Sequence, residues 1–223
     1  MKIKKVKSYA LSKKRLESII LTFTLSVTSS FAADINVPAD QPTIADAVSN
    51  ANAGDVIIIA PGTYVEQSEI IIDKQLTITS HWHTTDDTDF IRETVLDGVN
   101  KSNTLFQTRE NRGVNVEISG LTFTRFRKPI VLNDTAVIKN NVFTNNDSDS
   151  ISFESKGSGY AGYNTIEDSG DDGIDVDTID GTLITLEFNT IRNNGDEGIE
   201  IRLMDGAQSS ITYDIHDNIL KGN

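Results

Sequence analysis

The sequence predicts an all-β fold, a parallel β-helix, in which short strands stack coil upon coil as a solenoid. The first observation is an internal repeat: residues 188–201 align with residues 163–176 almost residue for residue, at an offset of 25. Looser copies begin at Asn141 and Asn218, and a period of this length is typical of stacked-repeat folds. The second observation is the short alternation of apolar and polar residues, as in residues 174–177, which indicates strands.

The third observation concerns helices. Between Gly54 and Asn223 no stretch keeps a three-four apolar spacing long enough for a helix, which argues against helical repeats. In a parallel β-helix, equivalent positions of successive coils lie about 4.8 Å apart. We therefore expect a ladder of asparagine amides at one point of each coil and aliphatic rows inside it. The ladder is Asn141, Asn164, Asn189 and Asn218, and the rows pair Ile166 with Ile191, Ile174 with Ile199 and Val176 with Ile201.

The amino-terminal segment predicts export. A basic stretch is followed by an uncharged, mainly apolar run from Ile19 to Ala32 that ends in small residues. This pattern is typical of a secretory signal and is too short and wrongly flanked for a membrane span. We predict a signal peptide over residues 1–32, the alternative being an uncleaved anchor, and a secreted, periplasmic or cell-surface protein. Residues 33–223 are expected to form one β-helix domain without a membrane span, continued beyond Asn223 by further coils or a domain, because the chain stops inside a coil.

Composition narrows the range of partners. Removing residues 1–32, which hold seven basic residues and one acidic residue, changes the net charge from −13 to −19. Nucleic acid is therefore not expected as a partner, whereas neutral sugars, cations and cationic proteins are compatible with this charge. The chain has no cysteine, so the stack itself must supply the stability that disulfides give many exported proteins.

The elements follow in order along the chain. Thr43 precedes an apolar stripe at helical spacing (residues 44–51), and Gly54 lies just past its end, so we predict one short helix that caps the open edge of the first coil. Strands are then expected at 56–59, 70–72 and 76–79, with a turn at 61–64, and the polar residues 81–93 are expected to form a loop inserted between coils. From Thr94 further strands are expected at 95–96, 105–106, 114–118, 121–123, 130–132 and 137–138.

Two segments carry a family resemblance. Residues 36–47 and 53–64 resemble the amino-terminal cap and first coil of the pectin-lyase-like right-handed parallel β-helix superfamily. The later Asn-Thr-Ile and Asp-x-Gly-Ile units resemble generic repeats of that superfamily, as in NosD-type periplasmic proteins and secreted polysaccharide-active enzymes. The resemblance implies a right-handed β-helix over residues 34–223 and a polysaccharide partner. It leaves the reaction open, because the superfamily contains lyases, hydrolases, esterases, epimerases and non-enzymes.

Acidic residues fall in two columns when the coils are aligned. Asp149, Asp172 and Glu197 form one, and Ser152, Asp175 and Glu200 form the other. Because residues 174 and 176 face the core, Asp175 should face outward beside Glu200, where repulsion raises a carboxyl pKa or attracts a cation.

Ca²⁺ would accept such a cluster of oxygen ligands, and the alternative is a solvated acidic face. The candidate calcium ligands are Asp171, Asp172, Asp175, Asp196 and Glu200, and the candidate substrate-binding residues are Asp172, Asp175, Glu197, Glu200 and Trp82.

Three basic residues are the candidates for catalysis. Uronate lyases of the resembling superfamily pair a group that neutralises the sugar carboxylate with an Arg or Lys that takes a proton. That resemblance points to Arg125, Arg127 and Lys128, the one basic cluster of the mature chain, with solvated turn cations as the alternative. Arg202 aligns with Asp177, so a cross-coil ion pair is expected there.

Two further motifs are weaker. Residues 170–172 (Gly-Asp-Asp) resemble a triplet of galacturonan hydrolases, but the Asn-Thr-Asp, Gly-His-Gly and Arg-Ile-Lys motifs of that family are absent. Acid-base work by Asp171 with Asp172 or Asp196 stays open. His81-Trp82-His83, read as strand-like, is either a metal pair or sugar platform, or a packed anchor of the loop.

Together these features predict a secreted carbohydrate-active or carbohydrate-binding protein, with a polysaccharide (uronate) lyase as the first hypothesis. The second hypothesis is a non-catalytic surface, adhesin-like or periplasmic accessory module that uses a sheet face for docking.

Overall fold

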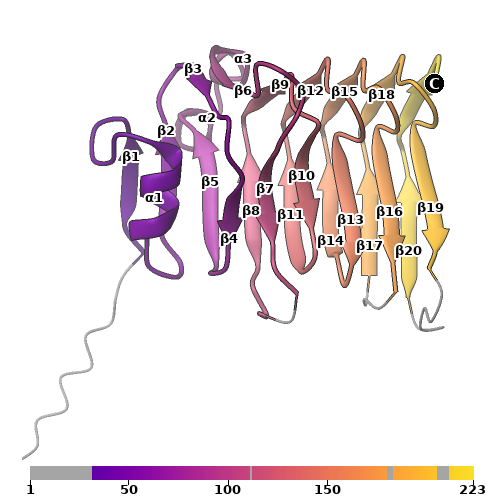
Figure 1. The fold of residues 1–223 in the computed structure, drawn as a ribbon, viewed down its shortest axis with the longest axis horizontal. Helices are drawn as coiled ribbons and strands as arrows, with labels where there is room; N and C mark the ends of the chain where they lie inside the picture. Colours follow the sequence, from indigo (N-terminus) through magenta and orange to yellow (C-terminus); the bar gives the residue numbers. More distant parts are fainter. Residues whose placement is uncertain (1–31, 111, 180–182, 205–210) are drawn as a thin grey trace, which may run out of the picture. The chain divides into compact units, whose positions relative to one another are not determined.

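The structure, a computed structural model, describes residues 32–110, 112–179, 183–204 and 211–223. Its strands form three parallel sheets, here called A, B and C, and the chain visits them in turn as it winds from coil to coil (Figure 1). This confirms the parallel β-helix. The predicted signal peptide lies, except for Ala32, outside the described residues.

Each sheet collects one strand from successive coils, in the order of the chain. Sheet A contains β1 (Asp34–Val37), β2 (Val56–Ile59), β5 (Leu76–Ser80), β8 (Val116–Ser119), β11 (Thr135–Lys139), β14 (Ser158–Gly162), β17 (Leu183–Glu187) and β20 (Thr212–His216). Sheet B contains β3 (Gly62–Val65), β6 (Thr94–Asp97), β9 (Thr122–Thr124), β12 (Val142–Thr144), β15 (Thr165–Glu167), β18 (Thr190–Arg192) and β21 (Ile219–Lys221). Sheet C contains β4 (Ile70–Ile72), β7 (Thr104–Thr108), β10 (Lys128–Leu132), β13 (Ile151–Ser155), β16 (Ile174–Thr178) and β19 (Ile199–Leu203).

The register places like residues above one another, as predicted. Ile174 pairs with Ile199 in sheet C and Ile166 pairs with Ile191 in sheet B. In sheet A a continuous inward row runs through Ile57, Ile78, Ile118, Ile138, Ala161 and Leu186, all of them buried. Because apolar burial contributes about 25 cal/mol per Å², these rows are the main source of stability in a chain without disulfides.

The asparagine ladder forms at the corner between sheets A and B. The Asn164 side-chain oxygen accepts from the backbone N–H of Asn141 at 3.0 Å. The Asn164 side-chain nitrogen donates to Asn189 Oδ1 at 3.0 Å and to the Ile138 carbonyl at 2.9 Å. Asn189 continues the ladder to Asn218. The ladder satisfies buried backbone groups where the chain turns, which is a structural role.

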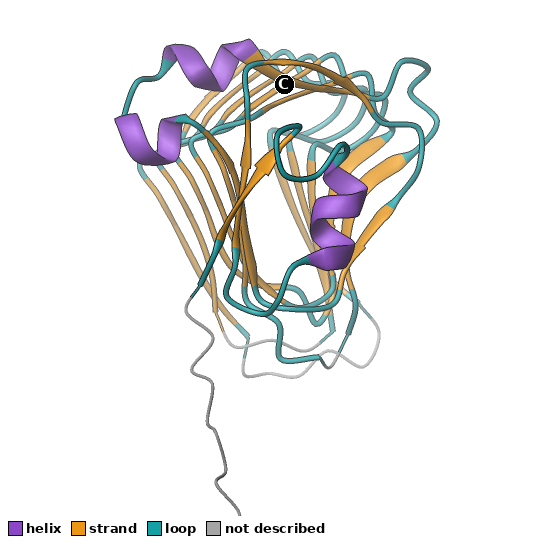
Figure 2. Cartoon of the chain, turned by 90° about the vertical axis from the view of Figure 1, so that its left-hand side faces the viewer, coloured by secondary structure: helices purple, strands orange, loops and turns teal. Residues whose placement is uncertain are grey.

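The first coil is capped by a helix, as predicted. Helix α1 (Ile44–Asn50) begins after Thr43, whose hydroxyl accepts from the Asp46 backbone N–H at 3.0 Å. Ile44, Ala47 and Val48 are buried on its inner side. Viewed along the solenoid, α1 lies across part of the end of the stack (Figure 2), where it covers apolar residues that the first coil would otherwise expose.

Two predictions about local structure were wrong. Residues 61–64 do not form only a turn, because β3 begins at Gly62 and pairs with β6. Residues 81–93 are inserted between coils as expected, but they form α2 (Trp82–Thr85) and α3 (Asp89–Glu93) in place of a loop. Helices of four and five residues leave no apolar periodicity to detect, and packing holds them: the Thr122 hydroxyl donates to the Ile91 carbonyl at 2.7 Å.

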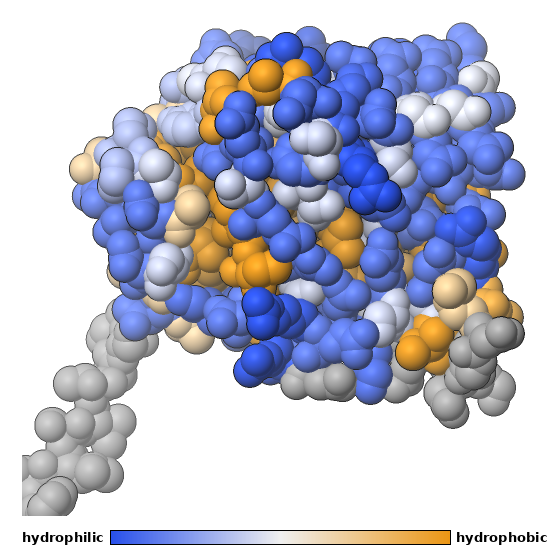
Figure 3. All heavy atoms as spheres, in the orientation of Figure 1, coloured by the Kyte–Doolittle hydropathy of each residue, from blue (hydrophilic) through white to orange (hydrophobic). Residues whose placement is uncertain are grey.

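Within the part of the chain that the structure describes, no helix is long and apolar enough to cross a membrane. The face drawn in Figure 3 is mostly hydrophilic, with apolar atoms gathered over the first coils and at the lower end of the last coil.

Candidate functional site

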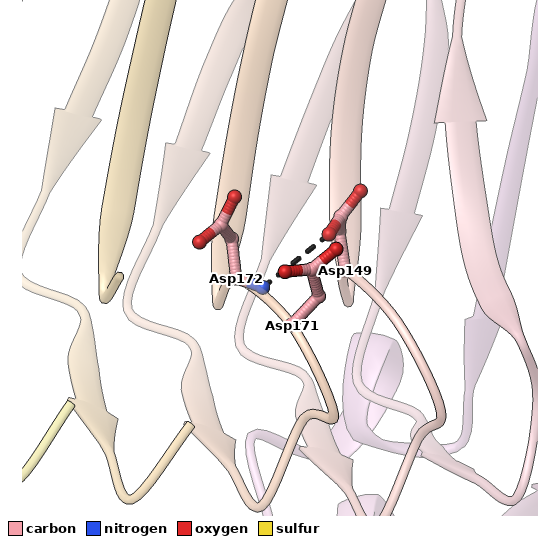
Figure 4. Close-up of side chains that lie close together, drawn as sticks. All are labelled: Asp149, Asp171 and Asp172. Carbon is pink, nitrogen blue, oxygen red and sulfur yellow. Dashed lines mark hydrogen bonds between the residues drawn. The ribbon is translucent and has the colours of Figure 1, made fainter. Parts of the chain in front are cut away.

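The acidic column forms at the corner between sheets B and C. Asp149 and Asp172 follow tight turns of successive coils, and each carboxylate accepts a backbone N–H from the next coil. Asp149 Oδ1 lies 3.3 Å from the Asp172 nitrogen, and Asp172 Oδ1 lies 2.8 Å from the Glu197 nitrogen. Asp171 comes from the same turn as Asp172 and points toward Asp149 (Figure 4). Asp171 is exposed, whereas Asp149 and Asp172 are each only 3% exposed.

The second column lies on the outer face of sheet C. Ser152, Asp175 and Glu200 are paired in register, as the alignment predicted. Asp175 was expected to face outward beside Glu200, and it is only 2% exposed. It faces away from the core, yet neighbouring side chains cover it: Arg202 Nη2 lies 3.3 Å from Asp175 Oδ1. The alternative of a solvated acidic face thus describes the exposed Asp171, Asp196 and Glu197 but not the buried Asp172 and Asp175.

Two cations enter the acidic region, one from each side. Lys128 Nζ lies 2.8 Å from Asp149 Oδ2 and 3.2 Å from Glu154 Oε1. Arg202 makes the predicted ion pair with Asp177, at 2.6 Å, and also reaches Glu200 at 2.9 Å. These contacts offset part of the repulsion between carboxylates that were brought together by the stacking of the coils.

The remaining repulsion and the burial shift the protonation of the cluster. Burial, with the Glu200 hydrogen bond and the Asp149 charge adding to it, raises the pKa of Asp172 to about 7 against the opposing Glu197 N–H. Burial and the charges of Asp149 and Asp177 raise the pKa of Asp175 to about 7, although Arg202 opposes the change. The pKa of Asp171 is also raised, first by burial and then by the Asp149 charge. The raised carboxyl pKa values agree with the prediction from the columns.

The carboxylates form two groups whose oxygen atoms lie within 4.8 Å of one another. The first group is Asp149, Asp171 and Asp172, and the second is Asp172, Asp175 and Glu200. Each group could hold a metal ion, so the oxygen-rich cluster predicted from the sequence exists. Of the other candidate residues, Asp196 belongs to neither group, and Glu197 is exposed, its pKa raised first by a hydrogen bond with Asp196.

The basic candidates do not form one cluster. Arg125 forms a bidentate ion pair with Asp97, which raises the pKa of its guanidinium. Arg127 is exposed, while Lys128 turns into the acidic cluster. Burial alone would lower the pKa of Lys128, but the ion pairs with Asp149 and Glu154 outweigh burial and raise it. Lys128 therefore belongs with the carboxylates, a position that the sequence alone did not indicate.

The His81-Trp82-His83 segment lies at and in α2, so the strand-like interpretation of it was wrong. Trp82 packs over Gly120, where a Cβ atom would come within 2.9 Å of the indole. The His81 ring lies 5.5 Å from the Phe90 ring of α3. These contacts fit the packed anchor that was one of the two interpretations of this segment.

The family model for the right-handed beta helix region matches residues 83–223. The chain belongs to this family. Among solved structures, the catalytic domain of Agl-KA is similar to this β-helix at 17% identity and a TM-score of 0.51, covering 79% of this chain and 43% of that one. The PL6 family alginate lyase AlyGC is 13% identical with a TM-score of 0.36, covering 85% of this chain and 40% of that one. The chain thus spans less than half the length of both structures, and the likeness to the Agl-KA catalytic domain shows the fold alone.

A search of curated proteins gives no match to this β-helix chain.

Proposed function

We propose that this β-helix protein hydrolyses glycosidic bonds of a neutral polysaccharide at the Asp149–Asp171–Asp172 group. The single observation that carries the proposal is the meeting of these carboxylates within 4.8 Å, with Lys128 paired to Asp149 and the pKa of Asp172 raised to about 7. Glycoside hydrolysis needs carboxyl groups of this kind, one holding a proton at neutral pH and another charged.

The chemistry follows from exposure. Asp171 is the exposed member, and its raised pKa suits a general acid that gives a proton to the leaving glycosidic oxygen. As that bond breaks, the Asp149 carboxylate, held by Lys128, stabilises the positive charge that develops on the sugar ring. The oxygen of a water molecule then bonds to the sugar carbon. The proton that this water loses goes to the Asp171 carboxylate, which restores the acid. Buried Asp172, whose pKa is raised to about 7, is the neighbour in the same turn and lies away from the substrate.

Charge favours a neutral substrate over a uronate. The chain carries a net charge of −13, and the acidic columns repel a polyanion. A lyase also needs a free cation for the sugar carboxylate and a base, yet Arg125 and Lys128 are held in ion pairs that raise their pKa values. An ammonium with a raised pKa is a poor base at neutral pH.

The experiment measures new reducing ends after incubation with β-glucan, α-glucan, xylan and mannan, and with polygalacturonate and alginate as charged comparators. We expect reducing ends from one neutral polysaccharide, lost in Asp171→Asn and kept in the exposed control Asp73→Asn. An ultraviolet-absorbing unsaturated product from a charged polymer would support the lyase. If no polymer is cleaved but one is bound, the protein is a non-catalytic binding module.

Ca²⁺ binding is a second candidate role for the same group, favoured by its oxygen-only composition. Lys128 competes for this role because it already neutralises Asp149. A rise of several degrees in Tm on adding millimolar Ca²⁺, reversed by a chelator and absent in Asp171→Asn, would support the ion. An unchanged Tm would leave the acid-base role.

We also propose that the protein is exported and acts on a polysaccharide outside the cytoplasm. The basic and apolar pattern of residues 1–32 supports it. Mass spectrometry of the protein from its native host is expected to give an amino terminus at Ala33, and a mature protein that still begins at Met1 would contradict export by this signal.

A further inference from the structure

A second surface lies across sheet B from the acidic group, at the corner between sheets A and B. The residue before each ladder asparagine has a left-handed backbone there: Asn140, Tyr163, Phe188 and Asp217 have φ between +54° and +58°. Gly120, at the equivalent position one coil earlier, has φ of +69°. Gly, Asn and Asp adopt this conformation readily, whereas a bulky aromatic residue does so at a cost in free energy.

The two aromatic residues do not recover that cost by burial. Tyr163 is 53% exposed and Phe188 is 42% exposed. Their rings stack with centroids 5.0 Å apart and planes 19° from parallel, and the His216 ring meets Phe188 edge-on at 6.0 Å. The result is a flat, exposed aromatic strip that runs along the solenoid over successive coils. The stability of the fold does not explain a strip that is both strained and exposed, whereas the binding of a ligand would.

A cavity adjoins the strip. It has a volume of about 380 Å³ and lies between α3 and the corner, lined by Asp89, Arg92, Asn140, Val142, Tyr163 and Thr165. This volume is in the range of small-ligand sites. The Thr122 hydroxyl donates to the Ile91 carbonyl at 2.7 Å and so anchors α3, one wall of the cavity, to sheet B.

The lining is suited to a sugar. Tyr163 supplies a flat apolar face for the C–H side of a ring, while Asp89, Arg92 and Asn140 supply donors and acceptors for hydroxyl groups. Within the described part of the chain, Arg92 makes no ion pair, so its guanidinium can donate to a ligand, while Tyr163 contributes the face of its ring. One cation and one anion in the lining cancel, which favours a neutral occupant.

We infer that this cavity and the Tyr163–Phe188 strip form a binding subsite for neutral pyranose rings. The inference rests on the proposed function for its substrate class and adds a place where the polysaccharide is held. The outer face of sheet B lies between this corner and the acidic group, and Thr144, Thr165 and Thr190 belong to its strands. Each of these strands is three residues long, or roughly 10 Å. A bound chain that crosses sheet B would reach from the subsite to Asp171.

Isothermal titration with hexasaccharides of the four neutral polysaccharides tests the subsite, with oligogalacturonate as the charged comparator. We expect one neutral hexasaccharide to bind, Tyr163→Asn to weaken it about tenfold, Phe188→Asn to weaken it less, and Tyr163→Phe to bind within about twofold of wild type. Since Asn adopts the left-handed conformation more easily, both Asn variants should keep or raise the Tm. A folding defect would instead lower both quantities.

The outcomes separate the two proposals. Unchanged binding in Tyr163→Asn, no binding of any neutral hexasaccharide, or tighter binding of oligogalacturonate would each overturn the subsite. Binding that depends on Tyr163 in a protein that cleaves nothing would uphold the subsite and overturn the hydrolase. The exposed control Asp73→Asn should bind the hexasaccharide normally, because Asp73 belongs to neither the acidic group nor the cavity lining.

Discussion

Replacing Asp172 by Asn should change how the stability of the protein depends on pH. A carboxyl whose folded pKa lies above its unfolded pKa binds more protons in the folded state between those two values. For Asp172 and Asp175 this window runs from 3.8 to about 7. Their contribution is fully present below the window and is lost as pH rises through about 7, so wild type should be less stable at pH 8 than at pH 5.

The size of the effect follows from the proton count. One pKa unit corresponds to about 1.4 kcal/mol, so a lone group shifted from 3.8 to about 7 would lose about 4 kcal/mol over the whole window. Asp172 and Asp175 share the neighbours Asp149 and Glu200, so their two shifts do not add. One extra proton held between pH 5 and 7 gives a loss of about 2–3 kcal/mol in wild type. Asp172→Asn keeps an acceptor for the Glu197 N–H and carries no charge, so it should lose less stability than wild type between pH 5 and pH 8.

The assay is urea unfolding at pH 5, 6, 7 and 8 for wild type, Asp172→Asn and the exposed control Asp73→Asn. His216 also has a raised pKa, caused first by its hydrogen bond to Asp217, and it contributes in the same direction. Its contribution cancels in the comparison between variants. Equal pH slopes in wild type and Asp172→Asn, or a wild type that is more stable at pH 8 than at pH 5, would refute the reasoning.

Three further substitutions test the rows and the ion pairs. Ile174→Asp buries a charge in the sheet C row and should cost more than about 4 kcal/mol, seen as loss of the urea transition; a cost below about 1 kcal/mol would mean that the row is not packed. Asn164→Ala removes four ladder contacts and should cost about 2–4 kcal/mol in the same assay, against less than about 0.5 kcal/mol for exposed Asn115→Ala, and similar costs would argue against the ladder. Lys128→Met leaves buried Asp149 without its cation, so it should lower the free energy of unfolding more at pH 8 than at pH 5. Equal decreases at the two pH values would mean that the charge of the ion pair does not contribute to stability.

The coil architecture could be predicted because, in a solenoid, residues one repeat apart in the sequence are in contact in the structure. Aligning Ile174 with Ile199 already states which residues touch, since each strand pairs with its equivalent one coil away. Helix α1 could also be predicted, because its capping residue Thr43 and its apolar stripe lie next to each other in the sequence. Helices α2 and α3 were not, since four or five residues carry too little periodicity, and they are held by contacts with β5 and β9 that no local pattern encodes.

The sequence alignment predicted which acidic residues stack in columns, but it did not predict how buried they are or which cations contact them. The alignment placed Asp175 above Glu200 correctly, yet direction away from the core does not set exposure, which depends on the reach of Arg202 from the next coil. It also could not show that Lys128 turns toward Asp149 while Arg125 turns toward Asp97, because both lie near the same corner of one coil. Side-chain direction at a corner is set by the turn, and turns vary between coils.

Some rows of stacked residues in this β-helix stabilise the fold, and others do not. Aliphatic core rows and the asparagine ladder each stabilise the stack, because every added coil adds a matching contact. A row of carboxylates repels itself, and an aromatic strip in a left-handed backbone is strained and exposed. Both kinds of row border the same three-residue strands of sheet B, one at each corner. Two costs on opposite edges of one narrow face are most simply explained by a ligand that crosses it, which is why the subsite and the acidic group are best tested on one polysaccharide.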